Sequence, residues 1–320
     1  MTTLKSDKKI MLTYGGLESS KDTVGTDFAI VGIPFDIRTT YRPGTRFGPD
    51  AIRRAFGKDS FNEAVGIDTA AYVKGVDYGD LFMRNPENAY LGPITDEMRE
   101  IIKTGTVPIV LGGDHSITFP ELLAYKDVYG PVSIIHFDSH TDTWGSDTDK
   151  EHHDHSTPFR RAVEYGCIDP KSSIQVGMRG GLSDRSDFDF ADNAGLTHIS
   201  AIDIHHIGIE KTAELIREKV GNNKVMVTFD IDFVDPAYAP GTGTPVPCGF
   251  SSREALELVR HALIGLDIVG FDLVEVAPNY DAGEITAILA GRLVHEFITC
   301  LACRKAGITE YGKKGMNENV

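Results

Sequence analysis

The sequence predicts an α/β protein whose strands form a parallel sheet covered by helices on both faces. Apolar, strand-like segments alternate with helical segments along almost the whole chain of 320 residues. The strand-like segments are rich in Val, Ile and Leu and show little polar alternation, which is typical of parallel strands buried on both faces. Eight such units fit either an open sheet or a closed eight-stranded barrel, so the strand pattern alone leaves both architectures open.

The elements follow one another in a regular order. The candidate strands cover residues 27–33, 71–79, 106–112, 131–137, 172–178, 196–200, 224–231 and 266–276. Clear helical periodicity covers 95–105, 208–221 and 251–265, where Thr95 and Ser251 or Ser252 are candidate N-caps. No repeat or Gly/Ser-rich linker divides the chain, so we expect a single domain over residues 1–320, with 1–25 as an N-terminal extension.

Composition excludes several classes of partner. The formal net charge of −15 argues against nucleic acid and against anionic membrane surfaces. No apolar run approaches the roughly 20 residues that span a bilayer, so we expect no membrane association. The N-terminal segment MTTLKSDKKI has charges but no apolar core behind them, unlike a secretory signal.

The four cysteines fit a protein of a reducing compartment, and we expect a cytoplasmic location. Cys300 and Cys303 form a CxxC motif within the amphipathic run LVHEFITCLACRKAG. No second cysteine pair is available to complete a zinc site, so the motif is interpreted as helix packing.

The segment HFDSHTDTW, residues 136–144, carries an unusual alternation at the end of an apolar strand. Asp138, His140 and Asp142 occupy every second position, and in an extended chain such side chains point to the same face. Two carboxylates held that close repel each other unless a cation lies between them. The alternative is a solvated strand end with polar side chains directed outward.

Three other candidate strands also end in acidic residues or histidines. The residues that follow these strands are Asp114 and His115, then Asp230, Asp232 and Asp235, and finally Glu275. Because ligand sites of parallel α/β proteins gather at the carboxyl ends of strands, we expect these side chains at one rim. A solvated strand end explains one such cluster but not four.

The donor set indicates two divalent cations and a hydrolase. Four carboxylates and two imidazoles carry a charge of about −4, which two divalent ions would neutralise. Oxygen ligands with two nitrogens and no thiolate favour Mn²⁺, with Ni²⁺ as an alternative and Co²⁺, Fe²⁺ or Zn²⁺ also compatible. Two such ions activate water as a nucleophile. The chain has no GxxxxGK[ST] phosphate loop and no GxSxG motif.

The motifs together resemble the ureohydrolase family of agmatinases, arginases and guanidinobutyrases. GGDHS, HFDSHTDT, HSTPFRRA, TFDIDFVDPAYAPGTGTPVP and DLVEVAP occur in one order, and the resemblance runs from Phe28 to Cys303. YRPGTRFGP and VGMRG are most similar to the agmatinase branch. The resemblance implies a three-layer α/β/α sandwich around a parallel sheet of about eight strands, rather than a barrel. It also implies a homo-oligomer, a trimer or a hexamer.

The resemblance assigns roles to individual residues. It implies that one metal ion is held by His115, Asp138, Asp142 and Asp230. It implies that the second is held by His140, Asp138, Asp230 and Asp232, with Asp138 and Asp230 bridging. Glu275 matches the acid that binds the guanidinium, His155 matches the histidine that gives a proton to the leaving amine, and Asp232 matches a proton acceptor. Trp144 and Thr244 are further candidate substrate-binding residues.

Several assignments stay open at this point. His152 and His153 compete with His155 in the stretch KEHHDHSTPF, and Ser156 replaces the glycine usual in relatives. Asp114 is interpreted as a supporting acid rather than a ligand. His205 and His206 are expected to be structural or exposed. Three arginines are expected to hold loops or to form subunit contacts, namely Arg42, Arg46 and Arg179.

The substrate expected from the resemblance is a small cationic guanidino compound. The first candidate is agmatine, which would be cleaved to putrescine and urea. The acidic loop 144–154 carries Asp147, Asp149, Glu151 and Asp154, which would repel a carboxylate tail and tolerate an amine tail. Trp144 and Tyr41 would equally close a small pocket around guanidine or an N-alkylated guanidine, and guanidinobutyrate is a further alternative. Two other readings are a non-catalytic subunit of a hetero-oligomer and a deacetylase-type amidohydrolase.

Overall fold

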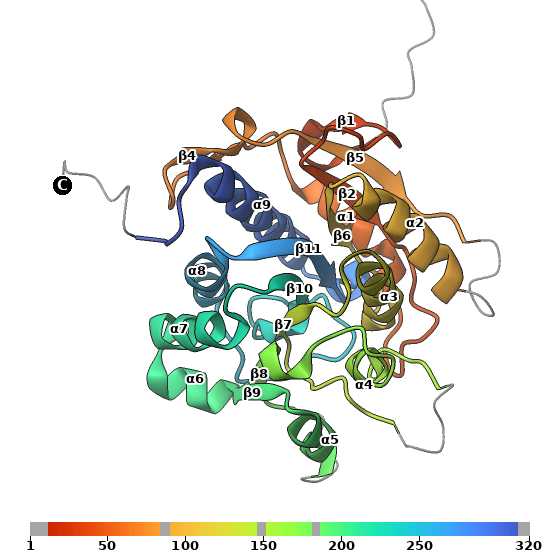
Figure 1. The fold of residues 1–320 in the computed structure, drawn as a ribbon, viewed down its shortest axis with the longest axis vertical. Helices are drawn as coiled ribbons and strands as arrows, with labels where there is room; N and C mark the ends of the chain where they lie inside the picture. Colours follow the sequence, from red (N-terminus) through yellow and green to blue (C-terminus); the bar gives the residue numbers. More distant parts are fainter. Residues whose placement is uncertain (1–11, 84–89, 146–151, 181–185, 313–320) are drawn as a thin grey trace, which may run out of the picture.

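The computed structural model describes residues 12–83, 90–145, 152–180 and 186–312. A nine-stranded sheet lies between two layers of helices (Figure 1). In spatial order its strands are β1 (Glu18–Ser19), β5 (Gly75–Asp80), β2 (Phe28–Gly32), β6 (Val107–Leu111), β11 (Asp267–Val274), β10 (Lys224–Asp230), β7 (Ser133–Phe137), β8 (Ile174–Met178) and β9 (Thr197–Ser200). All pairs in this sheet are parallel.

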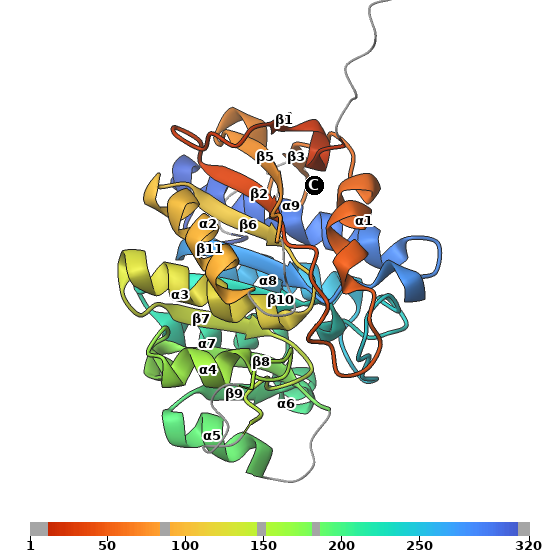
Figure 2. The same cartoon turned by 90° about the vertical axis from the view of Figure 1, so that its right-hand side faces the viewer.

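The sheet is open, with β1 and β9 at its two edges, which confirms the sandwich and excludes the barrel (Figure 2). All eight predicted strands are present. The short edge strand β1 is an addition, and a separate antiparallel pair joins β3 (Phe61–Asn62) to β4 (Ile67–Asp68). The strand predicted from residue 71 begins only at Gly75, because Asp68 caps a 3-10 turn over Thr69–Ala71.

Two helical layers cover the two faces of the sheet. One layer contains α2 (Leu91–Lys103), α3 (Thr118–Tyr129), α4 (Pro158–Glu164) and α5 (Ser186–Ala194). The other contains α1 (Gly48–Ala55), α6 (Ala201–Ile207), α7 (Ile209–Val220), α8 (Ser252–Leu263) and α9 (Ile285–Ala306). Short 3-10 helices cover Tyr14–Gly16, Thr45–Phe47, Thr69–Ala71, His115–Ile117, Pro170–Ser172, Ile231–Phe233 and Pro278–Tyr280.

Each face of the sheet carries its own apolar core, which explains the near-continuous apolar strands. Ile30 and Leu111 point into the core beneath α7, α8 and α9, whereas their chain neighbours Val31 and Val110 point into the core beneath α2 and α3. All four are fully buried. Alternate side chains of a strand face opposite layers, so a strand covered on both sides is apolar at most of its positions.

Of the two predicted helix starts, the cap at Ser251 is confirmed and the cap at Thr95 is wrong. Ser251 caps α8 in a capping box with Glu254, where each side chain binds the other residue's backbone N–H. Thr95 is not a cap: α2 begins four residues earlier, and the Thr95 hydroxyl donates to the carbonyl of Pro120 at 2.9 Å. A tertiary contact between α2 and the start of α3 therefore uses the side chain that local sequence assigned to a cap.

Two further segments bear on the sequence predictions. Within residues 1–25, Tyr14 is buried and stacks on Phe56 at 4.6 Å, and β1 extends the sheet beside β5. Among the described residues, α9 alone is long and apolar enough to span a membrane, and 83% of its most apolar stretch is buried inside the protein. Cys300 and Cys303 are free thiols buried in this helix, as the packing interpretation predicted.

Candidate metal centre and active site

The predicted site residues meet at the carboxyl ends of the four central strands β6, β11, β10 and β7. The chain passes from β6 through α3 to β7 and leaves room for β11 and β10 between them. Such a switch in strand order opens a crevice at the sheet edge. The cavity there has a volume of about 380 Å³ and is lined by Thr40, His140, Asp142, Trp144, Asp154, His155, Ser156, Asp230, Thr244 and Glu275.

Aspartates at three strand ends share one local device. Asp114, Asp138 and Asp230 each accept the backbone N–H two residues further on, at distances of 3.1, 2.6 and 2.8 Å. An aspartate that binds its own chain in this way ends the strand in a tight turn. The turn fixes one carboxylate oxygen and directs the other oxygen of Asp138 and Asp230 toward the imidazole of His115.

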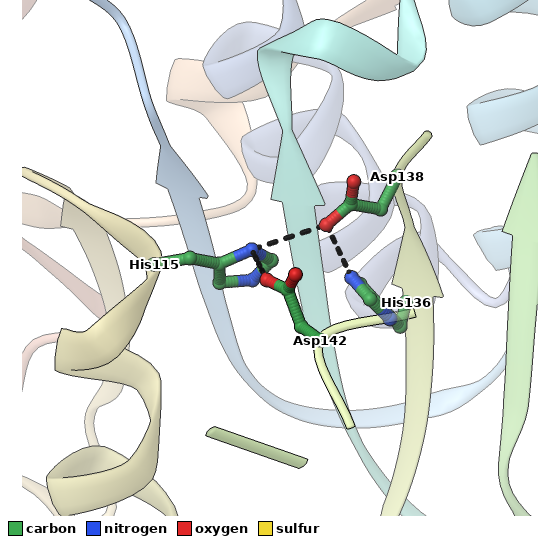
Figure 3. Close-up of side chains that lie close together, drawn as sticks. All are labelled: His115, His136, Asp138 and Asp142. Carbon is green, nitrogen blue, oxygen red and sulfur yellow. Dashed lines mark hydrogen bonds and ion pairs between the residues drawn. The ribbon is translucent and has the colours of Figure 1, made fainter. Parts of the chain in front are cut away.

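The first group of ligand-type side chains comprises His115, His136, Asp138 and Asp142 (Figure 3). Three carboxylates, two of them from this group, lie near Nδ1 of His115. This nitrogen lies 2.9 Å from Asp142, 3.1 Å from Asp138 and 3.4 Å from Asp230, each measured to Oδ2. Burial raises the pKa of Asp230 well above its usual range, and the carboxylates of Asp232 and Asp138 raise it further. A cation would relieve this repulsion, so the group fits a metal ion.

The second group comprises Asp138, His140 and Asp232. Nδ1 of His140 lies 3.0 Å from Oδ2 of Asp232 and 3.4 Å from Oδ1 of Asp138. Asp138 belongs to both groups, one oxygen facing each, as its predicted bridging position requires. Asp230 contacts the first group, and its bridging role stays a prediction.

His136 is part of the site and was not predicted (Figure 3). The amide nitrogen of Gln175 donates to Nδ1 of His136 at 3.0 Å and to the Thr141 carbonyl at 2.5 Å. Nε2 of His136 must then carry the proton and donate to Oδ2 of Asp138 at 2.7 Å. His136 lies two residues before Asp138, so the predicted alternation of Asp138, His140 and Asp142 begins one alternate position earlier, at His136.

A buried hydrogen bond holds the ring of His115 from behind. Its Nε2 lies 2.9 Å from the hydroxyl of the fully buried Thr228. The buried carboxyl of Asp272 lies near this hydroxyl and accepts from the Thr118 hydroxyl at 2.7 Å. When Nε2–H donates to Thr228, Nδ1 of His115 is left unprotonated, as a metal ligand requires.

Two site residues lie in the left-handed region of backbone conformation. Asp142 has a φ of 48° and Glu275 has a φ of 64°, values that non-glycine residues rarely adopt. Such backbone is tolerated where the surroundings hold it, and it clusters at functional sites. At Glu275, the backbone N–H is held by the Gly113 carbonyl at 2.9 Å.

Glu275 has one occupied and one free carboxylate oxygen. Oε1 accepts from the backbone N–H of His115 and from Nδ1 of His155, both at 2.9 Å. Oε2 is buried and has no hydrogen-bond partner among the described residues. Gly243 lies beside it, and a Cβ there would come within 3.6 Å of Oε2. The carboxylate is therefore anchored through Oε1, and Oε2 is left as an unused acceptor for a donor such as a guanidinium N–H.

His155 is the histidine of its stretch that reaches the cavity. Its burial would lower the pKa of the ring, but the Glu275 carboxylate outweighs burial and raises the pKa to about 9. His152 instead binds Asp154 at 2.7 Å, and His153 stacks on Phe119 at 5.4 Å. Ser156 adopts no positive φ, and both its N–H and its hydroxyl donate to Asp154.

The remaining candidates divide into lining and supporting residues. Trp144 and Thr244 line the cavity, and the Thr244 hydroxyl lies 3.4 Å from Oδ2 of Asp232. Asp235, expected at the rim, instead holds the backbone of Ala237 and Gly249. Tyr41 is 69% exposed and does not line the cavity.

The residues predicted to support the site contact loops and other side chains, as the sequence indicated. Asp114 accepts from the backbone of Arg38 at 3.0 Å, and burial together with Glu275 raises its pKa to about 7. Arg42, Arg46 and Arg179 hold loop carbonyls or Asp36. His205 stacks on Phe250 and is exposed, as is His206. Asp147, Asp149 and Glu151 of the acidic loop lie outside the described residues.

Comparisons with known proteins agree with this geometry. The sequence profile of the Arginase family matches residues 26–300. An agmatinase of Chromobacterium violaceum is 40% identical, covering 93% of this chain and 92% of its own length. The proclavaminate amidinohydrolase of Streptomyces clavuligerus is also 40% identical, covering 89% of this chain and 91% of its own. The crystal structure of a hypothetical agmatinase from Burkholderia thailandensis superposes with a TM-score of 0.85 at 39% identity, covering 93% and 92% of the two chains.

These likenesses extend over nearly the whole chain and exceed what a shared fold requires. The site residues lie at the same sheet edge that the family motifs predict, and they carry ligand groups for a pair of divalent cations. The chain therefore belongs to the Arginase family and is a hydrolase of C–N bonds in linear amidines.

Proposed function

We propose that the protein is an agmatinase that hydrolyses agmatine to putrescine and urea. The observation that carries the proposal is Oε2 of Glu275, a buried acceptor without a hydrogen-bond partner among the described residues, in a residue that lines the cavity. No lysine or arginine is found among the described residues that line the cavity, whereas four of them are acidic. A cationic guanidino group is the ligand that such a wall favours.

The two ligand groups fit a pair of divalent metal ions. His115, Asp138, Asp142 and Asp230 would hold one ion, and His140, Asp138, Asp230 and Asp232 would hold the other. We propose Mn²⁺, with Ni²⁺ as the alternative, because the donors are hard oxygens and two imidazoles without a thiolate. When bound, such a pair lowers the pKa of water and supplies hydroxide near neutral pH.

The protein's own side chains would orient the substrate and move protons. Oε2 of Glu275 would accept from the guanidinium in a charge-assisted hydrogen bond and hold its carbon toward the ligand groups. Asp232 would accept a proton from the attacking water. His155 would supply a proton to the departing amine nitrogen, so that the bond between this nitrogen and the guanidino carbon breaks and the carbon remains in urea.

Asp154 favours a substrate that carries an amine at the end opposite its guanidino group. It lines the cavity, and although burial would raise its pKa, hydrogen bonds from Ser156 and His152 hold the pKa below its usual range. An ionised carboxylate at this position attracts an alkylammonium tail and repels a carboxylate tail. Sequence identity does not distinguish the two substrates named for the curated relatives, because both enzymes are 40% identical to this chain.

The test is urea release by the Mn²⁺- or Ni²⁺-loaded protein with agmatine, guanidinobutyrate, arginine, guanidine and N-methylguanidine. We expect the highest kcat/KM with agmatine. Urea from none of them would overturn the ureohydrolase assignment, and a preference for guanidine or for guanidinobutyrate would replace agmatine with that substrate. Asp230→Ala should abolish metal binding and activity, whereas Asp235→Asn, in the same segment but bound to the loop backbone, should retain both.

We propose in addition that the protein acts as a homo-oligomer, a trimer or a hexamer, in the cytoplasm. The four cysteines, all within the described residues, are free thiols, which is compatible with a reducing compartment. Light scattering on the purified protein would give the oligomeric state, and a monomer would overturn that part of the proposal.

A further inference from the structure

Both ring nitrogens of His155 are engaged in hydrogen bonds that do not involve a substrate. Nδ1 lies 2.9 Å from Oε1 of Glu275. The backbone N–H of Thr40 donates to Nε2 at 3.0 Å, and the Thr40 hydroxyl lies 2.6 Å from the same nitrogen. The histidine that would protonate the leaving amine therefore has no free nitrogen to present to it.

The position of Thr40 is fixed by the segment around it. The backbone N–H of His155 donates to the Arg38 carbonyl at 3.2 Å, and Arg38 N–H donates to Asp114 at 3.0 Å. On the other side, the Arg42 side chain donates to the carbonyls of Thr242 and Gly243, both at 2.9 Å. The segment 38–42 is thus tied to the 242–243 loop and to the end of β6, with Thr40 held over the imidazole.

The Thr40 hydroxyl is the group that connects His155 to the cavity. Thr40 lines the cavity and is exposed, whereas the His155 side chain is only 8% exposed. A hydroxyl both donates and accepts, so it can receive a proton from one neighbour as it gives its own to another. A carboxylate on the far side of the ring, here Glu275, stabilises the protonated imidazole before transfer.

We propose that the hydroxyl of Thr40 relays the proton from Nε2 of His155 to the departing amine. The inference rests on the proposed ureohydrolase function. The Thr40 O–H proton moves to the amine nitrogen as the C–N bond breaks, and the bonding pair of that bond becomes the lone pair that takes it. The Nε2 proton moves to the Thr40 oxygen, so the hydroxyl is regenerated and the imidazole becomes neutral. The backbone N–H of Thr40 then donates to the vacated Nε2, which is the arrangement seen in the structure.

The first test compares Thr40→Val, which keeps the shape but loses the hydroxyl, with Thr40→Ser, which keeps the hydroxyl. We expect Thr40→Val to lower kcat with agmatine by about 10²-fold, with KM changed less than about threefold, and Thr40→Ser to restore kcat to within about threefold of the wild type. Thr39→Val is the matched control, because the neighbouring Thr39 hydroxyl is buried without a partner among the described residues. Equal kcat values for the valine and serine variants would overturn the relay.

A second test needs no substrate and separates the relay from the proposed function. In protein with ¹⁵N-labelled histidine, we expect the Nε2 proton of His155 to exchange with water at least tenfold more slowly in Thr40→Val than in Thr40→Ser, with the signal assigned by its loss in His155→Asn. Equal exchange would overturn the relay even if every guanidino compound released urea. Absence of urea from the wild type with unequal exchange would overturn the ureohydrolase proposal and leave Thr40 as the proton path of His155.

Discussion

Oε1 of Glu275 lies 2.9 Å from Nδ1 of His155, and this buried contact joins the end of β11 to a loop 120 residues away in sequence. The same oxygen holds the N–H of His115. Both anchors use Oε1, so the position of the carboxylate is fixed while Oε2 keeps its acceptor capacity. Pre-organisation of this kind lowers the cost of binding, because the carboxylate need not reorder.

Glu275→Gln tests the charge of that open oxygen. The amide retains the shape but loses the ionic hydrogen bond to a guanidinium, so kcat/KM should fall about 10- to 100-fold or more. Metal content measured by mass spectrometry should not change, because Glu275 belongs to neither ligand group. A parallel loss of metal would show that the residue supports the metal centre rather than the substrate.

The stability of the metal-free protein should depend on His155 above neutral pH. Glu275 raises the pKa of His155 from 6.5 to about 9, so the folded state binds its proton more tightly than the unfolded chain. This contribution is complete below about pH 6.5 and is lost as the pH rises through 9. It amounts to about 3 kcal/mol at most.

The check is denaturant unfolding of wild type and His155→Asn, both in EDTA, from pH 6 to pH 10. The difference in unfolding free energy between them should shrink across this range. A difference that stays constant with pH would contradict an ion pair between His155 and Glu275.

Thr228→Val should weaken metal binding although Thr228 is not a ligand. The hydroxyl is the hydrogen-bond partner of Nε2 of His115, and its loss would let the ring take the wrong tautomer. Removing such a partner typically costs about 10- to 100-fold in metal affinity. Isothermal titration with Mn²⁺ measures this effect directly.

Thr228→Ser keeps the hydroxyl and should bind Mn²⁺ as the wild type does. A matched control is Thr212→Val, because the Thr212 hydroxyl donates to the carbonyl of Gly208, the residue before α7, away from the site. Loss of affinity in the serine variant as well would point to packing rather than to the hydrogen bond.

Gly243→Ala should narrow the guanidinium pocket. A Cβ at this position would lie 2.9 Å from the Arg42 carbonyl, which is backbone and cannot move freely, and 3.6 Å from Oε2 of Glu275. We expect KM for agmatine to rise about tenfold or more, equal to at least about 1.4 kcal/mol of lost binding. Steady-state kinetics with agmatine and with guanidine give the comparison, and an unchanged KM for both would contradict the close approach of substrate to Gly243.

Asp154→Asn should reduce the preference for an amine tail over a carboxylate tail. The ratio of kcat/KM for agmatine to that for guanidinobutyrate should fall about tenfold, because the variant keeps one amide oxygen for Ser156 but loses the negative charge. Thermal unfolding of the variant checks that the loop is intact. An unchanged ratio would assign the selectivity to residues outside the described part of the loop.

The sequence determined the sheet and the ligand groups because both depend on local geometry. Short runs rich in Val, Ile and Leu between helical segments are typical of parallel strands buried on both faces, and alternation in an extended chain turns Asp138, His140 and Asp142 to one side. The carboxyl ends of parallel strands meet at one edge, so acids after β6, β7, β10 and β11 had to be neighbours. His136 was available to the same reasoning and continues the same alternation.

Other features were decided only by tertiary structure. Three histidines lie within four residues, and only the path of the loop selects His155 for Glu275 while His152 and His153 bind elsewhere. Thr40 reaches His155 across 115 residues, and Thr228 reaches His115 across 113. No local propensity encodes such pairs, because they depend on how loops and core helices pack around the sheet. The sequence therefore determined that acids and histidines gather at one edge of the sheet, and the packing of distant segments decided which hydrogen bonds hold their side chains.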